Sequence, residues 1–166
     1  MPESLAELIA TLPQQGVIEW IGLRREKRGR VESVHATVAE PGTGLVGDHF
    51  SATRSDREVS LIQAEHLSVL AELMNTGPID PASLRRNIVV RGINLLALRS
   101  RRFRVGEALL EFSGLAVPCS RMETTLGPGG YNAMRGHGGI TAKVISGGAI
   151  EVGAAVTAAE MLRIGS

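Results

Sequence analysis

Cys119 is the only cysteine of the chain and the first candidate for a reactive residue. Pro118 precedes it and Ser120-Arg121 follow it, which predicts a turn from a strand into a helix. A helix N-terminus and a nearby arginine both favour the thiolate, the form of cysteine that attacks electrophiles and binds soft metals. The alternative is a small buried hydrophobic residue without a chemical role. A lone thiol excludes an internal disulfide and any metal site with several thiolates from this chain.

A second group of candidate residues, Arg85, Arg86 and Asn87, lies where a loop joins an apolar strand expected at 87–90. Side chains at such a junction can be held towards a pocket, because the strand beneath them is rigid. Arginine and asparagine there supply fixed donors to a phosphate or to the edge of a pterin-like heterocycle. The alternative is that these residues only cap an exposed strand end.

Asp48 and His49 follow three glycines, Gly42, Gly44 and Gly47, which are spaced as G-x-G-x-x-G. No amphipathic helix follows these glycines, so we favour a glycine-rich loop between β elements over a dinucleotide site. Glycines in such a loop still let backbone amides approach an anion closely. The Asp48-His49 pair is either part of a catalytic site or a turn-stabilising carboxylate beside a surface imidazole.

Two segments of the chain are rich in arginine. The first follows a predicted strand and contains Arg24, Arg25, Lys27, Arg28 and Arg30. It is either a solvated hairpin loop or an anion-binding rim for a phosphate-bearing ligand. The second contains Arg99, Arg101, Arg102 and Arg104. We expect this second segment on the exposed face of a strand, without a separate role.

Short β-strands separated by glycine and proline must position these residues. The expected strands span 17–23, 31–38, 58–62, 87–90, 102–105, 108–112, 140–145 and 149–152. Many short strands together with 20 glycines predict a closed or nearly closed β architecture. The expected fold class is therefore mainly β, of the β-rich α+β kind.

Helices are expected at the N-terminus and at two peripheral positions. The first covers residues 4–12, with a capping box at Ser4 and Glu7. Its apolar side chains share one helical face: Leu5, Leu8, Ile9 and Leu12. The other helices are expected at 64–74 and just after Pro118, whereas 76–83 and 127–130 are predicted to be turn-forming loops. This pattern divides the chain into an N-terminal helical lead, 1–15, and one domain, 16–160.

The composition of the chain excludes several functional classes. At 166 residues, with 43% hydrophobic and 21% charged residues, it is expected to form one globular domain. A net charge of +1 and 3% aromatic residues argue against a nucleic-acid partner. No apolar run reaches the roughly 18 residues of a membrane-spanning helix, so no membrane partner is expected. Glu3 and Glu7 stand where a signal peptide carries positive charge, so we expect a cytoplasmic location.

Several short segments, taken in order, resemble the MOSC family, which is named for the C-terminal domain of molybdenum-cofactor sulfurases. They are GLVGDH at 44–49, RNIVV at 86–90, GI at 92–93, FRVG at 103–106, PC at 118–119, GITAKV at 139–144 and GGAIEVG at 147–153. Their order and spacing over residues 16–157 carry the resemblance. The chain departs from the family pattern at Arg85-Arg86, before Asn87-Ile88, and at Ala154, where an aspartate is frequent.

The resemblance implies a barrel-like domain whose Pro-Cys cysteine binds molybdenum or carries sulfur. In the amidoxime-reducing branch of the family, this thiolate ligates a molybdenum held by a pterin dithiolene, which makes Cys119 the implied catalytic residue and metal ligand. A single soft thiolate suits such a site, because the pterin supplies the other sulfur ligands. The implied cofactor-binding residues are Arg24, Arg25, Asp48, His49, Arg86, Asn87 and Ser120.

Three functions remain open at this point. The first is a molybdenum-cofactor (molybdopterin) enzyme that reduces small N-hydroxylated or N-oxide-type substrates with electrons from a separate reductase. The second is a sulfur carrier or transferase that receives sulfur from a donor as a Cys119 persulfide. The third is a non-catalytic module that binds the cofactor. No pyridoxal phosphate, flavin or haem is expected, because the chain lacks their motifs.

Overall fold

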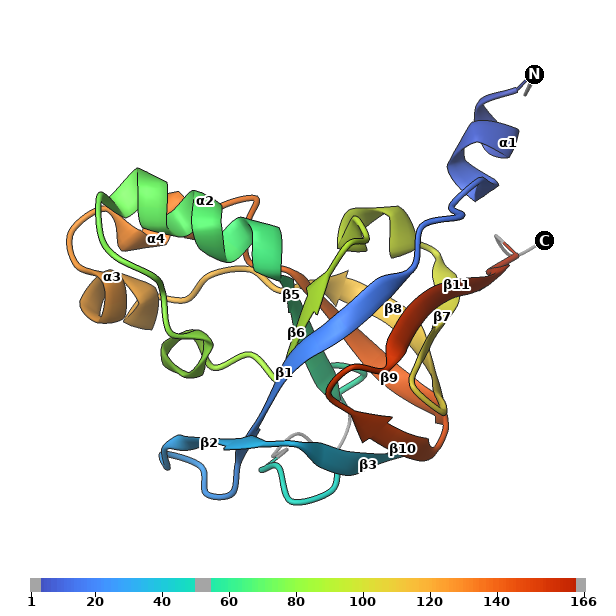
Figure 1. Ribbon diagram of the computed structural model, residues 1–166, viewed down its shortest axis with the longest axis horizontal. Helices are drawn as coiled ribbons and strands as arrows, with labels where there is room; N and C mark the ends of the chain where they lie inside the picture. The colour runs from blue at the N-terminus through green and yellow to red at the C-terminus, as the bar shows by residue number, and fades with distance from the viewer. Residues whose placement is uncertain (1–3, 50–54, 164–166) are drawn as a thin grey trace.

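Short strands make up most of the regular secondary structure, as the runs of β-branched and aliphatic residues predict. The computed structural model describes residues 4–49 and 55–163 (Figure 1). The strands are β1 (Gly16–Arg24), β2 (Val31–Val34), β3 (Ala36–Glu40), β4 (Gly44–Leu45), β5 (Val59–Gln63), β6 (Ile88–Arg91), β7 (Arg101–Val105), β8 (Ala108–Leu115), β9 (Ile140–Ser146), β10 (Gly148–Glu151) and β11 (Ala155–Met161). The helices are α1 (Leu5–Ala10), α2 (Ala64–Met74), α3 (Arg121–Leu126) and α4 (Gly130–Met134), with single 3-10 turns η1 (Pro81–Leu84) and η2 (Leu95–Leu98).

The main sheet closes into a barrel. Its strand order is β11-β7-β8-β9-β5-β6-β1-β2, and an additional pairing between β11 and β1 joins the two sides of the ring, leaving β2 outside it. The β5–β6 ladder is parallel, whereas the other ladders that join the ring are antiparallel. A smaller sheet of β10, β3 and β4 lies beside one end of the barrel (Figure 1). The prediction of a mainly β, barrel-like fold is confirmed.

Each segment predicted as a strand contains one, and three features differ from the prediction. The two-residue strand β4 lies in the segment predicted as a glycine-rich loop. The segment 31–38 is divided by a bend at His35 into β2, which pairs with β1, and β3, which pairs with β10. The strand β11 was not predicted, because its sequence AVTAAEM is rich in alanine, which has a low intrinsic preference for strands. Tertiary pairing with β7 and β1 determines its conformation.

The strands β5 and β6 are buried on both faces, which explains their unbroken apolar runs. Leu61, Ile88 and Val90 point into the barrel core. Ile62 and Val89, which alternate with them, belong to a second core under α2, α3 and α4. The helices therefore cover the outer face of the same two strands that lead to the candidate site.

The predicted helices are present, and some local helical turns were missed. The helix α2 has the predicted bounds, α3 begins after Ser120, and α1 carries the predicted capping box. The turn η1 and the helix α4 extend into segments predicted as loops; η1 is capped by the Asp80 side chain, which accepts a hydrogen bond from the Ala82 amide. No helix in the described part of the chain is long and apolar enough to cross a membrane.

The prediction that the second arginine segment lies on an exposed strand face is wrong for Arg101. Arg101 is buried, and its guanidinium donates hydrogen bonds to the Ala159 and Ala10 carbonyl oxygens. A guanidinium carries several donors in a rigid fork, so one side chain can hold two segments. Arg101 thereby fastens the end of α1 to β11.

We predict that two glycines with similar backbone torsion angles tolerate alanine very differently. Gly136 and Gly139 have φ angles of 81° and 89°, so alanine is strained at both, by about 1–2 kcal/mol. A Cβ at Gly136 meets nothing within 4 Å, whereas one at Gly139 overlaps the Leu61 carbonyl oxygen. Gly139→Ala should therefore lower the free energy of unfolding by at least about 3 kcal/mol. Urea denaturation of both variants measures the free energy of unfolding. Equal losses in the two variants would contradict the close approach of Gly139, just before β9, to Leu61 of β5.

Candidate functional site

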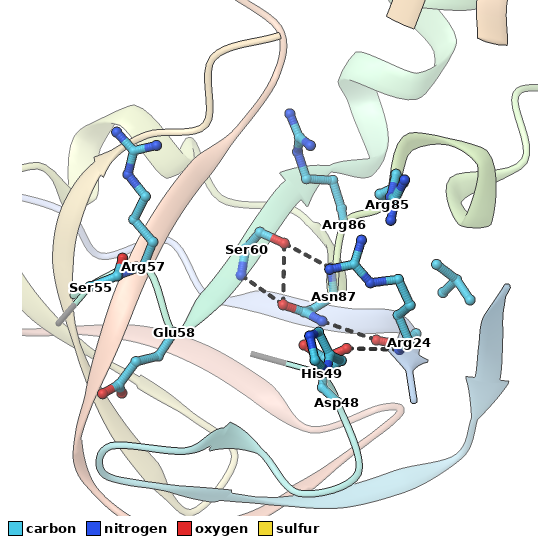
Figure 2. A pocket seen from close by; sticks show the side chains of 12 residues that line it. Arg24, Asp48, His49, Ser55, Arg57, Glu58, Ser60, Arg85, Arg86 and Asn87 are labelled. Carbon is cyan, nitrogen blue, oxygen red and sulfur yellow. Dashed lines mark hydrogen bonds between the residues drawn. The ribbon is translucent and has the colours of Figure 1, made fainter. Parts of the chain in front are cut away.

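A cavity of about 290 Å³ opens where β1, β2, β5 and the segment before β6 meet (Figure 2). We call it the arginine cavity. It is lined by Gly22, Arg24, Val31, Asp48, His49, Ser55, Arg57, Glu58, Ser60, Arg85, Arg86 and Asn87. Four arginines and a histidine face two carboxylates, so the lining carries an excess of positive charge. Such a lining suits an anionic ligand.

Backbone hydrogen bonds hold Asp48 and His49 at the mouth of this cavity. The Asp48 carboxylate accepts a hydrogen bond of 2.7 Å from the Arg24 backbone amide. The His49 amide in turn donates to the Arg24 carbonyl oxygen. These two bonds join residues far apart in the sequence, so they tie the segment 48–49 to the end of β1 and place the imidazole beside Arg24 (Figure 2).

Asn87 joins three strands behind the cavity. Its Oδ1 accepts hydrogen bonds from the Ser60 amide at 3.0 Å and the Ser60 hydroxyl at 3.2 Å. Its Nδ2 donates to the Gly22 carbonyl oxygen at 3.2 Å. A buried amide is stable only when its polar atoms are paired, and these bonds meet that need. Asn87 thus fixes β5 and β1 against the start of β6.

The Arg86 side chain turns away from the group around His49 (Figure 2). Its guanidinium donates hydrogen bonds to the carbonyl oxygens of Gly138 at 2.8 Å, Leu84 at 3.1 Å and Ala116 at 3.3 Å. Burial lowers the pKa of Arg86, and the nearby Cys119 partly opposes this by favouring the charged guanidinium. Arg86 therefore connects the cavity with the loop that carries Cys119.

Two nitrogen atoms of the cavity lining are buried and have no hydrogen-bond partner among residues 4–49 and 55–163. They are Arg24 Nε and His49 Nε2. A buried polar atom left unpaired costs roughly 1–3 kcal/mol, so such atoms are uncommon unless a ligand or water completes them. Both belong to side chains that line the arginine cavity. A polar ligand that reached either nitrogen would supply the hydrogen bond that it lacks.

Cys119 is exposed and lies just before α3, as predicted. The alternative of a buried hydrophobic cysteine is wrong. Its carbonyl oxygen accepts a hydrogen bond of 3.0 Å from the Met122 amide, in the turn that begins the helix. Cys119 does not line the arginine cavity, but it lies within electrostatic range of Arg86, which does.

The structure gathers five of the seven expected cofactor-binding residues at the arginine cavity. These are Arg24, Asp48, His49, Arg86 and Asn87. Arg25 is an exception, because it forms an exposed ion pair with Glu32 across the β1–β2 hairpin, with an N–O distance of 2.7 Å. Ser120 is also exposed and lies beside Cys119, outside the cavity.

Arg57, Glu58 and Ser60 line the cavity and were not predicted as site residues. They lie at the start of β5, which reaches the site because it pairs in parallel with β6. No local pattern in the sequence reveals this pairing. The Glu58 carboxylate accepts hydrogen bonds from the Gly42 and Val144 amides, so it anchors the glycine-rich loop to β9. That loop connects β3 and β4, as predicted.

Outside the arginine cavity, the imidazole rings of His66 and His137 are in contact, which the sequence did not indicate. Their rings pack edge to face with centroids 5.1 Å apart. Burial lowers the pKa of His66, the neighbouring His137 lowers it further, and Glu65 opposes the shift. In the described ranges no group of three or more His, Cys, Asp and Glu side chains is placed to hold a metal ion.

We predict that Arg86→Lys destabilises the protein by about 3 kcal/mol, because a lysine cannot donate to three separated carbonyl oxygens. Chemical denaturation measures the loss. Arg85→Lys is the matched control, because the Arg85 guanidinium makes one long contact of 3.4 Å with the Lys27 carbonyl oxygen. Equal stability losses in the two variants would contradict the bridging role of Arg86.

We also predict that His66 makes the protein less stable in acid. Its pKa is lower in the folded chain than the ordinary value near 6.5, so the unfolded chain binds the proton first as the pH falls. Well above pH 6.5, His66 is neutral in the unfolded chain and has no such effect. As the pH falls below about 6.5, proton uptake by the unfolded chain progressively lowers the free energy of unfolding. The His66→Gln variant should therefore lose less stability than the wild type between pH 7 and pH 5, a range of about two units. Equal losses of stability in the wild type and in His66→Gln over this range would contradict the prediction.

The fold and the sequence both match known proteins. The family model of the MOSC domain matches residues 48–157, well over half of the chain. The YuaD protein from Bacillus subtilis superposes with a TM-score of 0.75 at 19% identity, covering 88% of this chain and 97% of that one. YiiM from Escherichia coli gives a TM-score of 0.69 at 19% identity, covering 88% and 71%.

At these identities the two structures show a shared fold and nothing further. No curated protein matches this chain in sequence. The MOSC domain is associated with binding of the molybdenum cofactor. The match over 48–157 includes Asp48, Arg86 and Cys119, so most of the residues described above lie within the matched domain. The chain belongs to the MOSC domain family.

Proposed function

We propose that this chain binds the molybdenum cofactor and uses it to reduce small N-hydroxylated or N-oxide-type compounds. The observation that carries the proposal is the pair of unpaired buried nitrogens, Arg24 Nε and His49 Nε2, in a cation-rich cavity. The cofactor has an anionic phosphate at one end and a soft metal at the other. The cavity offers donors for the first, and Cys119 offers a thiolate for the second.

In this proposal the arginine cavity holds the phosphate end of the cofactor. Arg24 and His49 donate to the phosphate oxygens, which would satisfy both unpaired nitrogens. Arg57 adds a further cation from the other side of the cavity (Figure 2). Asn87 keeps β1, β5 and β6 in register, so that these donors are held in place before the ligand arrives.

Cys119 supplies the metal ligand in the same proposal, and Arg86 positions it. The Ala116 carbonyl oxygen, three residues before Cys119, accepts one of the three Arg86 hydrogen bonds. When bound, the cofactor supplies two-electron oxygen-atom transfer. The exposed position of the thiol leaves room for a small substrate beside it. Electrons come from a separate reductase, because four cysteines for an iron–sulfur cluster are not available in this chain.

A sulfur-transfer function is the second candidate, and the exposure of Cys119 favours it. A thiol outside the arginine cavity can accept the outer sulfur atom of a persulfide on a donor protein, which leaves as a thiol, and can pass that sulfur to an acceptor. No rearrangement of the barrel is needed for that encounter. The two candidates differ in whether Cys119 holds a metal or a sulfur atom in the isolated protein.

We predict that protein made in a cofactor-producing host and purified without oxygen contains molybdenum and pterin in near-equal amounts. Metal analysis and pterin fluorescence after oxidation measure both. Cys119→Ala should lower metal content at least about tenfold, which corresponds to a loss of roughly 1.4 kcal/mol of binding free energy. Arg24→Gln should lower both metal and pterin, because it removes a donor to the phosphate.

Arg25→Gln is the control for Arg24→Gln, because Arg25 is the adjacent arginine but lies outside the cavity. It should keep wild-type cofactor content. Folded wild-type protein without metal and pterin would refute the proposal. If its Cys119 then gained the mass of one sulfur atom on loading with a sulfur donor, the sulfur-transfer function would replace it.

A further inference from the structure

The helix α1 presents an apolar face that its own domain does not cover. Leu5, Leu8 and Ile9 are 71%, 55% and 53% exposed, and no residue of the helix is buried. Helices shorter than about 12 residues are only marginally stable in water unless an apolar face is packed. The capping box and the Arg101 hydrogen bond to Ala10 hold α1 in place, but they leave this face open. Figure 1 shows α1 standing away from the barrel.

A hollow of about 810 Å³ lies between α1 and η2. Leu8 and Ile9 line it on one side, and Leu96, Ala97 and Met161 on the other. Leu96 also lines a smaller apolar hollow of about 110 Å³ that Leu115 and Val117 share. The two hollows therefore meet at Leu96, and the apolar surface continues from α1 across η2 to the loop before Cys119.

The size of this surface is at the upper end of what a monomer exposes. Its six large side chains are 44% to 71% exposed: Leu5, Leu8, Ile9, Leu96, Leu115 and Val117. Together they expose on the order of 600 Å², whereas a monomer's largest apolar patch is roughly 300–600 Å². A standard protein interface buries about 800 Å² on each partner, so these residues would supply most of one.

We propose that this surface is the interface of a homodimer, in which α1 of each copy fills the hollow of the other. A two-fold axis brings the same patch of both copies together, so the patch must carry both a ridge and a matching groove. Here the ridge of Leu5, Leu8 and Ile9 lies directly beside a groove of similar chemistry. Each chain thus carries both a ridge and a groove, and the dimer contains two identical ridge-in-groove contacts.

The charges of the two elements agree with this pairing. The charged residue of α1 is Glu7, and the charged residue among those that line the hollow is Arg99. Insertion of α1 from the second copy therefore brings an acidic helix to a groove with a basic rim. A small apolar ligand would fill the hollow, but it would leave Leu5 on the outer part of the ridge exposed.

The proposed dimer does not depend on the proposed binding of the molybdenum cofactor.

Sedimentation velocity of the full chain at micromolar concentrations tests the proposal. The wild type should be dimeric. Leu8→Glu should raise the dissociation constant at least about tenfold, because it places a carboxylate in both contacts. The variant should keep its fold, because Leu8 is exposed and packs on no core residue of its own domain. The control Leu73→Glu changes a leucine of α2 that is 58% exposed, and it should remain dimeric.

Mixing two variants tests the helix-into-groove arrangement itself. Leu5→Glu damages the ridge alone, because Leu5 does not line the hollow, whereas Leu96→Glu damages the groove, so each variant alone should be monomeric. A mixture can form a heterodimer with one undamaged contact, and it should therefore dimerise more than either variant alone. A monomeric wild type, a dimer that survives Leu8→Glu, a dimer lost equally in Leu73→Glu, or a mixture without heterodimer would overturn the proposal. A monomeric wild type that retains a small apolar ligand would assign the hollow to that ligand.

Discussion

The guanidinium of Arg86 holds together three parts of the chain that are far apart in sequence. Its partners are carbonyl oxygens from η1, from the segment after β8 and from the turn before β9. Taking a charge out of water is unfavourable unless hydrogen bonds replace the lost solvent, and three carbonyl groups do so here. The Ala116 amide also donates to the Gly139 carbonyl oxygen, so the loop leading to Cys119 is held by the backbone as well. Arg86 adds the direct link between this loop and the segment before β6, and it thereby helps to fix the position of the thiol relative to the cavity.

The site separates two kinds of chemistry in space. The arginine cavity is polar and cation-rich, whereas Cys119 lies outside it next to Pro118 and Val117, at the edge of an apolar surface. The net charge of the chain is only +1, so the positive character is local rather than spread over the surface. A local field of this kind acts on a bound anion and has little effect on distant polyanions. The proposed cofactor, which has an anionic end and a metal end, would use both parts.

Features set by neighbouring residues were predictable from the sequence, and features set by tertiary pairing were not. The capping box at Ser4, the helix 64–74 and the turn at Cys119 depend on nearby positions, and the structure contains them. The alanine-rich β11 has no strand pattern of its own. Arg101 was expected in solvent, because sequence spacing does not reveal that the Ala159 and Ala10 carbonyl oxygens lie within reach. The same limit hid Ser60 and Arg57, which reach the cavity through a parallel pairing.

The closure of the barrel also constrains when the protein can fold. The ring is completed by β1 and β11, which pair Gly16 with Val156 near opposite ends of the sequence. A ribosome makes β1 first and β11 last of the barrel strands, so the Gly16–Val17 end of β1 lacks its partner until β11 is made, whereas β2 pairs with the other end, 21–24. The strands that form the cavity, β1, β5 and β6, are available much earlier. The chain can therefore assemble its ligand-binding strands before the barrel is sealed, and an exposed strand edge has to be kept from pairing with other chains until then.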